Sequence, residues 1–325
     1  MAACDHPPGI TAPRLRHRPA GETPTGATET GALPIIAGGA ARPCHSAGGV
    51  HNRSRMATNL FDLTNEVAVV IGAGGVLAGA VAEGFAAAGA KVAVVDLRPE
   101  AGEARAKHIR DHGGTAQFFQ ANAMERDSLQ RAHDAIVASL GAPTILFNAA
   151  GGNDPKTTVT PDNPFEAIPL ENWKRNFDLN LVAGVLLPCQ VFGPGMVARR
   201  KGSIINIASV SAHIPLSRVV SYSAAKAGVL SLSRFLAREW ATQGVRVNTL
   251  TPGFFPADQN RALLFKADGS PTDRTQQIWN HTPMRRFGEA QELVGAAIFL
   301  ASDRASGFVT GADLRVDGGF LAQTI

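Results

Sequence analysis

The sequence predicts one α/β domain in which helices cover both faces of a doubly wound parallel sheet of about seven strands. From Val67 onward, short runs of valine, isoleucine and alanine alternate with longer amphipathic segments, as they do in successive right-handed βαβ units. The short runs are apolar at almost every position, which is typical of parallel strands that are buried on both faces. The alternation shows no second domain boundary before the end of the chain.

The elements follow one another with the lengths expected of strands and helices. "VAVVIG" and "KVAVVD" are nearly continuous apolar runs, and "VLAGAVAEGFAAAG" between them has the length of a helix that ends at Gly89. The predicted strands are residues 67–72, 91–96, 115–120, 144–148, 203–208, 245–250 and 313–317. The predicted helices are residues 76–89, 125–140, about 170–200, 222–243 and about 289–301. One irregular insertion, about 254–285, precedes the last helix, and a loop of this length is usually functional.

The composition is that of a globular protein, since hydrophobic residues make up 45% of the chain and charged residues 18%. The longest apolar segment, "LVAGVLLPCQVFGPGMVA", is interrupted by Pro188, Pro194 and several glycines, so we predict no transmembrane span. Cys4, Cys44 and Cys189 are far apart and odd in number. They indicate neither a disulfide framework nor a metal site, and they favour a reducing, cytoplasmic location.

Residues 1–57 are predicted to be a disordered extension of a domain that spans residues 58–325. The first 55 residues hold seven of the 20 prolines and eight of the 34 glycines, and they show no helical or strand periodicity. They carry a net charge of +3 out of the chain's +4, so the folded part is nearly neutral and we expect no nucleic-acid partner. We interpret them as an extension upstream of a start at Met56. An Arg-rich transit peptide is the alternative, and three acids in the segment argue against it.

A glycine-rich turn in "VVIGAGGVLAG", residues 69–79, joins the first predicted strand to the first predicted helix. Its glycines allow the backbone to approach a ligand closely, and the amino end of the helix offers free N–H groups to a pyrophosphate. Asp96 follows about 20 residues later, where a carboxylate accepts hydrogen bonds from the adenosine ribose of NAD and repels the 2′-phosphate of NADP. This order predicts a Rossmann-type NAD site. Because Arg98 is close enough to contact a 2′-phosphate, NADP is the alternative cofactor. The alternative role of Asp96 is to cap the helix that follows it.

Tyr222 is the only tyrosine in the chain, and it stands four residues before Lys226 in "SYSAAKAG". On a helix these two side chains lie one turn apart on the same face. A lysine ammonium near a phenol favours the phenolate and lowers its pKa from about 10, which suits tyrosine for proton transfer. Ser209 follows "SIINIA" at the carboxyl edge of the predicted sheet, where its hydroxyl can hold a substrate oxygen beside Tyr222.

With this combination of motifs, residues from about 61 to 325 resemble the short-chain dehydrogenase/reductase family. The matching motifs, in order, are the glycine turn, "NAAG", "NFDLN", Ser209, "YSAAK", "TPG" and "VDGG". The resemblance implies that Tyr222 donates and accepts the proton while Ser209 orients the carbonyl. It also implies that Lys226 holds the nicotinamide ribose and lowers the pKa of the tyrosine, and that Asn180 anchors a water of the proton relay.

The same resemblance implies the contacts to the cofactor and the assembly. The residues expected to contact NAD are Gly72, Gly75, Val76, Leu77, Asp96, Asn122, Ala123, Asn148, Ala149, Ala150, Tyr222, Lys226, Pro252, Gly253 and Phe255. The chain departs from the family pattern at several positions. Asn122 replaces an aspartate that contacts adenine, and the segment after "TPG" lacks the usual threonine. The glycine turn has Ile71, Val76 and Ala78 in place of a threonine and two glycines, and Ala208 replaces a serine. The helices at about 170–200 and 222–243 are rich in apolar and small residues. In the family such helices pair across two-fold axes, so we expect a homotetramer.

Within that family, "GAGGVLAG", "PGFFPADQNRALL", "DGSPTDR" and "HTPMRRFGE" are similar to the branch of D-mannonate oxidoreductases and fructuronate reductases. This similarity implies NAD-dependent interconversion of a keto sugar acid and its hydroxy acid. Such a substrate needs a cation for its carboxylate and amides for its hydroxyls. The candidates near the expected site are His213, Arg218, Gln259, Asn260 and Arg261. The alternatives are a reductase of acyl thioesters or other ketones, of the gluconate 5-dehydrogenase or 3-oxoacyl reductase type, and a non-catalytic NAD-binding sensor.

Overall fold

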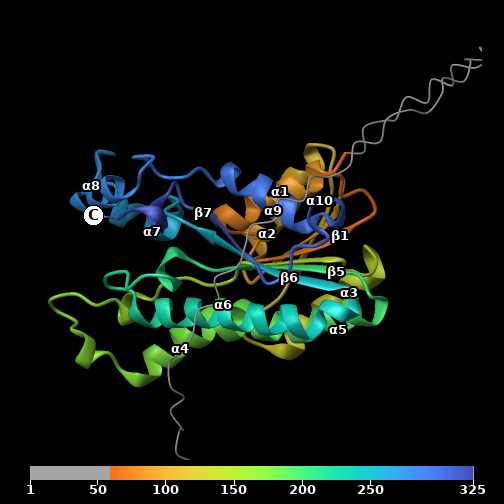
Figure 1. The fold of residues 1–325 in the computed structure, drawn as a ribbon, viewed down its shortest axis with the longest axis horizontal. Coiled ribbons are helices and arrows are strands. Elements are labelled where there is room, and N and C mark those ends of the chain that lie inside the picture. The colour runs from red at the N-terminus through yellow and green to blue at the C-terminus, as the bar shows by residue number, and fades with distance from the viewer. Residues whose placement is uncertain (1–58, 325) are drawn as a thin grey trace, which may run out of the picture. The chain divides into compact units, whose positions relative to one another are not determined.

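Seven parallel strands form one sheet in the computed structural model, which describes residues 59–324 except for the side chains of Asp258, Gln259 and Ala262 (Figure 1). The strand order is β3-β2-β1-β4-β5-β6-β7. The bounds are β1 Val67–Ile71, β2 Lys91–Asp96, β3 Thr115–Gln120, β4 Ile145–Asn148, β5 Gly202–Ile207, β6 Val245–Pro252 and β7 Asp313–Val316. The order reverses between β1 and β4, and ligands of open α/β sheets bind outside the carboxyl ends of such strands. The predicted doubly wound sheet is confirmed, while the predicted extension over residues 1–57 lies outside the described residues.

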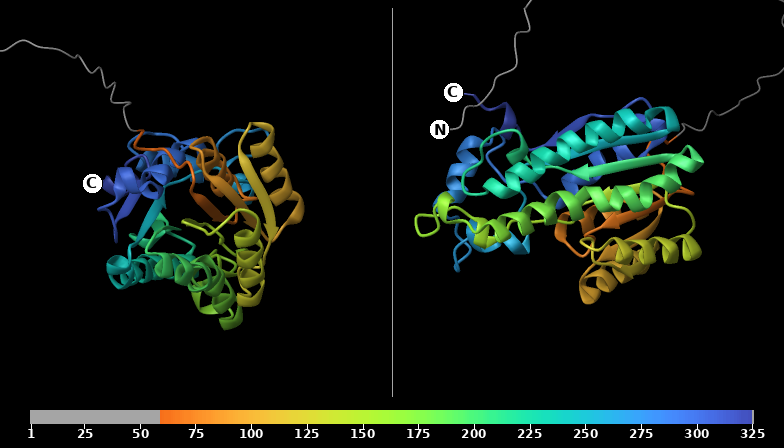
Figure 2. Two further views of the ribbon diagram at one scale, coloured as in Figure 1. Left: turned by 90° about the vertical axis from the view of Figure 1, so that its right-hand side faces the viewer. Right: turned by 90° about the horizontal axis from the view of Figure 1, so that it is seen from below.

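Helices pack on both faces of the sheet (Figures 1 and 2). One face is covered by α1 (Val76–Ala87), α2 (Pro99–Asp111) and α9 (Val294–Ala301). The opposite face is covered by α3 (Arg126–Ser139), α4 (Leu170–Leu181), α5 (Leu187–Arg199) and α6 (Val220–Trp240). The other α-helices of the described chain are α7 (Asp258–Leu264), α8 (Asp273–His281) and α10 (Asp303–Ser306). Single 3-10 turns cover Pro155–Thr157, Phe165–Ala167, Val210–Ala212, Ala241–Gln243, Ala290–Leu293 and Phe320–Ala322.

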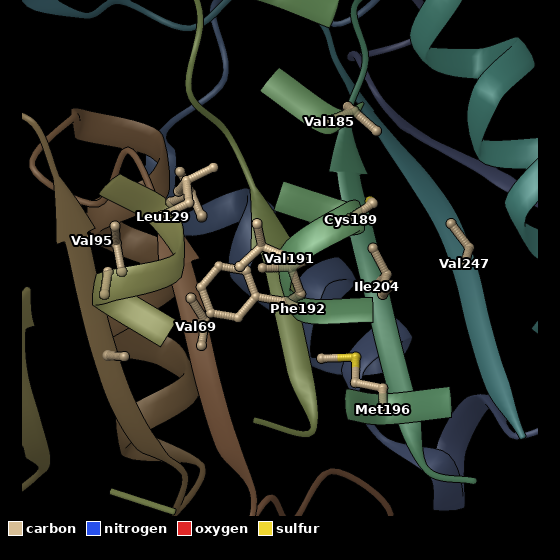
Figure 3. Packing of buried hydrophobic residues seen from close by; sticks show 14 of the residues in the cluster. Val69, Val95, Leu129, Val185, Cys189, Val191, Phe192, Met196, Ile204 and Val247 are labelled. Atoms are coloured by element: carbon tan, nitrogen blue, oxygen red, sulfur yellow. The ribbon is translucent and has the colours of Figure 1, made fainter. Parts of the chain in front are cut away.

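Alternate side chains of each strand separate the core into two halves. In β1, Val69 packs on the side of α3 and α5, whereas Val70 packs on the side of α1. Figure 3 shows the first half, in which Leu129 from α3 and Phe192 from α5 cover the strands. Burying each such side chain stabilises the fold by roughly 1.5–3 kcal/mol. Both faces of the sheet are therefore apolar, which explains the nearly continuous apolar runs of the strands.

Residues Leu170–Arg199 form one continuous helical segment, in which a π-helical turn at Val182–Leu186 joins α4 to α5. The predicted helix at about 170–200 is therefore confirmed, and neither Pro188, in the first turn of α5, nor Pro194, inside it, breaks the segment. By length and composition it is apolar enough to span a membrane, but half of its most apolar stretch is buried inside the protein. Packing against the sheet accounts for that composition.

Two parts of the structure differ from the prediction. α2 was not among the predicted helices, because few of its residues are buried and its sequence shows only a weak apolar pattern. The insertion at about 254–285 is not irregular, since it contains α7 and α8. Leu264 and Ile278 from these helices form a small separate core with Phe287, and this core gives the insertion a defined structure.

Candidate active site

The glycine turn between β1 and α1 has the conformation that its residues predict. Gly72 has a φ of +83°, a left-handed conformation that glycine adopts without strain. A Cβ at this position would lie 3.1 Å from the backbone nitrogen of Ala150, because the segment after β4 runs against the turn. Gly75 is the N-cap of α1, and no side chain of the described residues caps the first turn at Val76 and Leu77. The free N–H groups and the positive dipole end of α1 therefore suit an anion such as a pyrophosphate.

Asp96 is held at the end of β2 by two backbone N–H groups. Its Oδ2 accepts a hydrogen bond of 2.9 Å from Gly74 N, and its Oδ1 accepts one of 2.9 Å from Arg98 N. The Arg98 guanidinium also contacts Oδ1 at 3.2 Å, although that side chain is 60% exposed. α2 begins at Pro99 with Arg98 as its N-cap, so Asp96 does not cap this helix. The carboxylate is fixed beside the glycine turn, where it can accept hydrogen bonds from a ribose.

The two asparagines expected at a cofactor site have side chains that are already engaged. Asn122 Oδ1 accepts from Met124 N at 3.1 Å, and its Nδ2 donates to Glu125 Oε1 at 2.7 Å. Asn148 is buried in the core, where its Nδ2 donates to Asn206 Oδ1 at 2.8 Å, while its Oδ1 has no partner among the described residues. Because this side chain is buried in the core, a cofactor would meet Asn148 mainly through backbone groups. The neighbouring expected contacts Ala123, Ala149 and Ala150 are half-buried.

The segment that follows β6 is tightly packed. Pro252 ends the strand, and a Cβ at Gly253 would lie 2.7 Å from Asp317 Cα, so "TPG" and "VDGG" pass close to each other. Phe255 is buried and lines a cavity of about 380 Å³ together with Phe287. The residues predicted to transfer the proton are not among those that line this cavity, which therefore lies apart from the predicted chemistry.

Ser209, Tyr222 and Lys226 come together where β5 ends and α6 begins. Lys226 is buried, and its Nζ donates a hydrogen bond of 2.8 Å to the carbonyl oxygen of Ile207, the last residue of β5. The same nitrogen lies 5.7 Å from the centre of the Tyr222 ring. Tyr222 is half-buried and its phenol lies beside the Ser209 hydroxyl, which accepts hydrogen bonds from Ser211 N at 3.2 Å and from Ser211 Oγ at 3.0 Å. The structure therefore confirms that these side chains, which the sequence placed at one edge of the sheet, are neighbours.

Burial shifts the pKa of both titratable groups in this cluster. It lowers the pKa of Lys226 from 10.5 to about 8, because the buried ammonium loses its hydration. It raises the pKa of Tyr222, and the neighbouring Ser209 hydroxyl only partly opposes this shift. The sequence predicted the reverse for Tyr222, namely a pKa lowered by the lysine. In the structure, desolvation of the phenolate outweighs that attraction, since the Lys226 ammonium lies over the ring and is bonded to Ile207.

Asn180 is fully buried in α4, and its amide is fully engaged in hydrogen bonds. Its Oδ1 accepts from Gly152 N at 2.9 Å, while its Nδ2 donates to Gly152 O and to Asn176 O, both at 2.8 Å. A Cβ at Gly151, whose φ is +146°, would lie 2.6 Å from Asn180 Oδ1. The loop after β4 thus needs a glycine there to reach Asn180. Because the amide is engaged in this way, Asn180 can anchor a relay water only through its backbone.

A second buried asparagine, Asn176, was not predicted as a site residue. Its Nδ2 donates to Gly152 O at 3.1 Å, and its Oδ1 accepts from the Ser221 hydroxyl at 2.8 Å. Asn176 thereby connects the residue before Tyr222 to the same loop that Asn180 holds. The signal in the sequence is the pair of asparagines four positions apart in "NFDLN", which places both on one face of a helix.

Asn260 and Arg261, two of the residues expected to contact a sugar acid, both lie in α7. Asn260 Oδ1 accepts from Ala257 N at 2.8 Å, and its Nδ2 donates to Phe255 O at 2.9 Å, so its amide fixes the loop between β6 and α7. The Arg261 guanidinium lies 5.6 Å from the centre of the Phe265 ring. The hydrogen bonds of Asn260 argue against its predicted role, and the sequence could not show them because they depend on how α7 folds back. Arg261 is exposed, so its predicted role stays a prediction.

The remaining three candidates differ in their surroundings. His213 follows the short 3-10 turn after Ser209, and its Nε2 lies 3.2 Å from Asp313 Oδ2, without the geometry of a hydrogen bond. The side chain of Gln259 is outside the described residues. Arg218 is exposed in the loop before α6, and it has no ion pair within the part of the chain that the structure describes. Of the predicted cations, Arg218 and Arg261 are therefore both exposed and available to a carboxylate.

Known proteins share this architecture and its motifs. Residues 72–321 match the family model described as Enoyl-(Acyl carrier protein) reductase. A relative from Haemophilus influenzae, named only as an uncharacterized oxidoreductase, is 40% identical over 275 residues, which cover 81% of this chain and 95% of the relative. The match spans the glycine turn, Ser209, Tyr222 and Lys226.

Two solved structures are also similar over 81% of this chain. The first, from Haemophilus influenzae and provisionally assigned as a D-mannonate oxidoreductase, contains NAD; it has a TM-score of 0.77 and 38% identity, with 97% of its own chain covered. The second is a gluconate 5-dehydrogenase from Burkholderia cenocepacia in complex with NADP and tartrate, with a TM-score of 0.73, 34% identity and 98% coverage. The chain therefore belongs to the short-chain dehydrogenase/reductase family of NAD(P)-dependent oxidoreductases that act on CH–OH groups.

Proposed function

We propose that this protein uses NAD(H) to interconvert a keto sugar acid and its hydroxy acid, in a reaction of the fructuronate/mannonate type. The observation that carries the proposal is the convergence of Tyr222, Ser209 and the buried Lys226 at the sheet edge that also bears the glycine turn. The similar structures named for mannonate and gluconate support the sugar-acid class. The exposed Arg218, four residues before Tyr222, supports a substrate with a carboxylate.

In the proposed reduction, Ser209 donates a hydrogen bond to the carbonyl oxygen of the substrate and Tyr222 delivers the proton. Bound NADH supplies the hydride that adds to the carbonyl carbon. As the π electrons of the C=O bond move onto the oxygen, Tyr222 transfers its hydroxyl proton to that oxygen and becomes a phenolate. The raised pKa of Tyr222 keeps the phenol protonated at neutral pH, ready to donate. Lys226, with a pKa of about 8, is largely charged at neutral pH and stabilises the phenolate.

The residues at the sheet edge fit a nicotinamide dinucleotide. A side chain at Gly72 would fill the place where the turn approaches the segment after β4, and the uncapped amino end of α1 suits a diphosphate. We propose NAD rather than NADP, because the Asp96 carboxylate stands where the ribose hydroxyls would bind and would repel a 2′-phosphate. Arg98, the alternative phosphate contact, is paired with Asp96.

A reductase of acyl thioesters or other ketones is the second candidate, because the matching family model bears the name of an acyl-carrier-protein enzyme. An acyl chain would gain nothing from the exposed Arg218, so we favour the sugar acid. A sensor that binds NAD without catalysis is the remote alternative. We further propose a cytoplasmic homotetramer. The assembly is supported by Phe235, an aromatic side chain that is 56% exposed on α6. The cytoplasmic location is supported by the buried free thiol of Cys189, which suits a reducing compartment.

A panel of three substrates tests the proposal. NADH oxidation by the full-length protein is measured side by side with fructuronate, 5-ketogluconate and an acetoacetyl thioester. We expect the highest kcat/KM with one of the two sugar acids, and loss of that activity in Tyr222→Phe. Preference for the thioester would overturn the sugar-acid class. Binding of NADH without turnover of any carbonyl compound would support the sensor instead.

A further inference from the structure

His213 and Asp313 carry two buried polar atoms that have no hydrogen-bond partner among the described residues. His213 Nε2 lies 3.2 Å from Asp313 Oδ2, and the two side chains are only 16% and 11% exposed. A buried donor or acceptor that lacks a partner destabilises a protein. A small rotation of the imidazole ring turns this contact into a hydrogen bond that satisfies both atoms, because Nε2 can donate and a carboxylate oxygen accepts.

The carboxylate of Asp313 is fixed on the sheet. Asp313 is the first residue of β7 and lies opposite Thr249 of β6. Its Oδ1 accepts hydrogen bonds from the Thr249 hydroxyl at 2.7 Å and from the Thr251 hydroxyl at 2.6 Å. An exposed arginine, Arg315, approaches Oδ2 at 3.6 Å. The carboxylate is therefore held by two neighbouring strands at the point where it meets His213.

His213 ends the turn that begins at Ser209. Residues Val210–Ala212 form a single 3-10 turn, with Ser209 as its N-cap and His213 as its C-cap. The backbone N–H of His213 donates to Val210 O at 3.1 Å and closes the turn. The turn packs against α6, the helix that bears Tyr222. An imidazole bonded to β7 therefore fixes the far end of this turn, and with it the place of Ser209 beside Tyr222.

The Ser209 hydroxyl needs a fixed position because its own proton is the one offered to a substrate. Its oxygen accepts hydrogen bonds from Ser211 N at 3.2 Å and from Ser211 Oγ at 3.0 Å. Both acceptor positions of the hydroxyl are thus used inside the turn, and its proton is left for a carbonyl oxygen. A shift of the turn would move this donor away from the carbonyl, and a misplacement of about 1 Å can lower a rate about 100-fold.

We propose that His213 and Asp313 form a positioning pair, in which His213 Nε2 donates to Asp313 Oδ2 and holds the turn that carries Ser209. This inference rests on the proposed role of Ser209, and it is independent of which carbonyl compound is the substrate. It gives His213 a role that acts through Ser209, in place of the substrate contact expected from the sequence. The sequence could not show the pair, because the two residues are far apart in the chain and meet only across β6.

Steady-state kinetics of the full-length protein test the pair. NADH oxidation is measured with whichever of fructuronate, 5-ketogluconate and the acetoacetyl thioester gives the highest turnover. His213→Leu and the shorter His213→Asn both remove the donor from Asp313, whereas His213→Gln keeps an N–H donor of similar reach. We expect the Leu and Asn variants to lower kcat about tenfold or more with little change in KM. His213→Gln should recover most of this loss.

A double variant shows whether His213 acts through Ser209. In a Ser209→Ala background, His213→Leu should lower kcat no more than about twofold further, because the effects of residues that act as a unit are not additive. His133→Leu is the matched control. His133 also lies beside an aspartate, with its Nδ1 2.9 Å from Asp134 Oδ1, and its side chain is 19% exposed, but it stands on α3. This variant should have the kcat of wild type.

Hydrogen–deuterium exchange supplies a readout that does not depend on turnover. The peptide that contains residues 209–213 should exchange faster in His213→Leu and His213→Asn than in wild type, because the backbone hydrogen bonds of the turn open more often once its end is released. The same peptide should exchange at the wild-type rate in His213→Gln and in His133→Leu.

The outcomes separate this inference from the proposed function. Unchanged kcat, or unchanged exchange of residues 209–213, in His213→Leu and His213→Asn would overturn the positioning pair and leave the proposed function standing. An undiminished loss of kcat in the Ser209→Ala background would also overturn it, because His213 would then act independently of Ser209. If none of the three carbonyl compounds is turned over, the proposed function falls, and the exchange experiment alone decides whether the pair holds the turn.

Discussion

Ser221 and Asn176 are joined by a buried hydrogen bond, in which the Ser221 hydroxyl donates to Asn176 Oδ1 at 2.8 Å. Asn176 in turn donates to the carbonyl oxygen of Gly152 in the loop after β4. Ser221 directly precedes Tyr222. The position of the phenol is therefore tied, through one asparagine of α4, to the loop that borders the glycine turn.

Ser221→Ala should destabilise the protein, because it leaves Asn176 Oδ1 buried without a donor. Such a loss costs roughly 1–3 kcal/mol, and we expect the free energy of unfolding measured with urea to fall by about this amount. Ser223→Ala is the matched control. Its half-buried hydroxyl donates only to Val219 O, at 2.8 Å in the same turn of helix, so the loss should be smaller. If the free energy of unfolding fell equally in the two variants, the hydrogen bond between Ser221 and Asn176 would stabilise the protein no more than the helix hydrogen bond of Ser223.

Tyr222→Phe should abolish proton transfer while leaving the fold intact, because it removes one hydroxyl from a half-buried ring. General acid–base catalysis contributes about 10²–10⁴-fold to a rate, so kcat should fall by at least this range. NADH binding, measured by fluorescence titration, should stay within about twofold of wild type. Turnover near the wild-type level across pH would contradict the proton-transfer role.

Lys226 should make the stability of the folded protein depend on pH. Its pKa is about 8 in the folded protein and 10.5 when exposed, so between these values the unfolded chain binds a proton that the folded protein lacks. The contribution of this group to stability is therefore unfavourable below about pH 8 and improves as the pH rises toward 10.5, by at most roughly 3 kcal/mol. We expect the free energy of unfolding of wild type, relative to Lys226→Met, to increase from about pH 7.5 to about pH 9.5. A difference that does not change with pH would show that Lys226 keeps its ordinary pKa.

The sheet and the cluster around Tyr222 were predictable because their signals are local. A strand buried on both faces is apolar along its whole length, and the carboxyl ends of parallel strands share one edge. Ser209 and Tyr222 therefore had to lie near each other once β5 and α6 were recognised. α2 was missed because an exposed helix needs few apolar residues.

The direction of polar side chains could not be predicted, since it depends on neighbours that are distant in the sequence. Asn148 and Asn180 stand in motifs that suggested direct roles, yet their amides bond to Asn206 and Gly152 inside the protein.

The exposed face of α6 should form a subunit interface. Ala224, Ala227, Ser231 and Phe235 are exposed along this helix at spacings of three and four residues, which places them on one side. An exposed stripe of small residues with one aromatic ring suits close packing against a second copy. We expect light scattering to report a tetramer for wild type and a smaller species for Phe235→Asp. Val137→Asp, at an exposed valine of α3, is the control and should stay tetrameric. A stable, active wild-type monomer would refute the assembly.

Asp96 should set the preference for NADH. Its carboxylate is held by Gly74 N and Arg98 N, so its negative charge stays fixed beside the glycine turn. We expect kcat/KM of wild type to be higher with NADH than with NADPH. Asp96→Asn removes the charge and releases the Arg98 guanidinium, and the ratio of kcat/KM for NADPH to that for NADH should rise about tenfold or more. Glu100→Gln, in the first turn of α2, is the control for a general change in charge and should leave the ratio unchanged. A wild-type preference for NADPH would contradict this prediction, and it would mean that Arg98 leaves Asp96 to bind the 2′-phosphate.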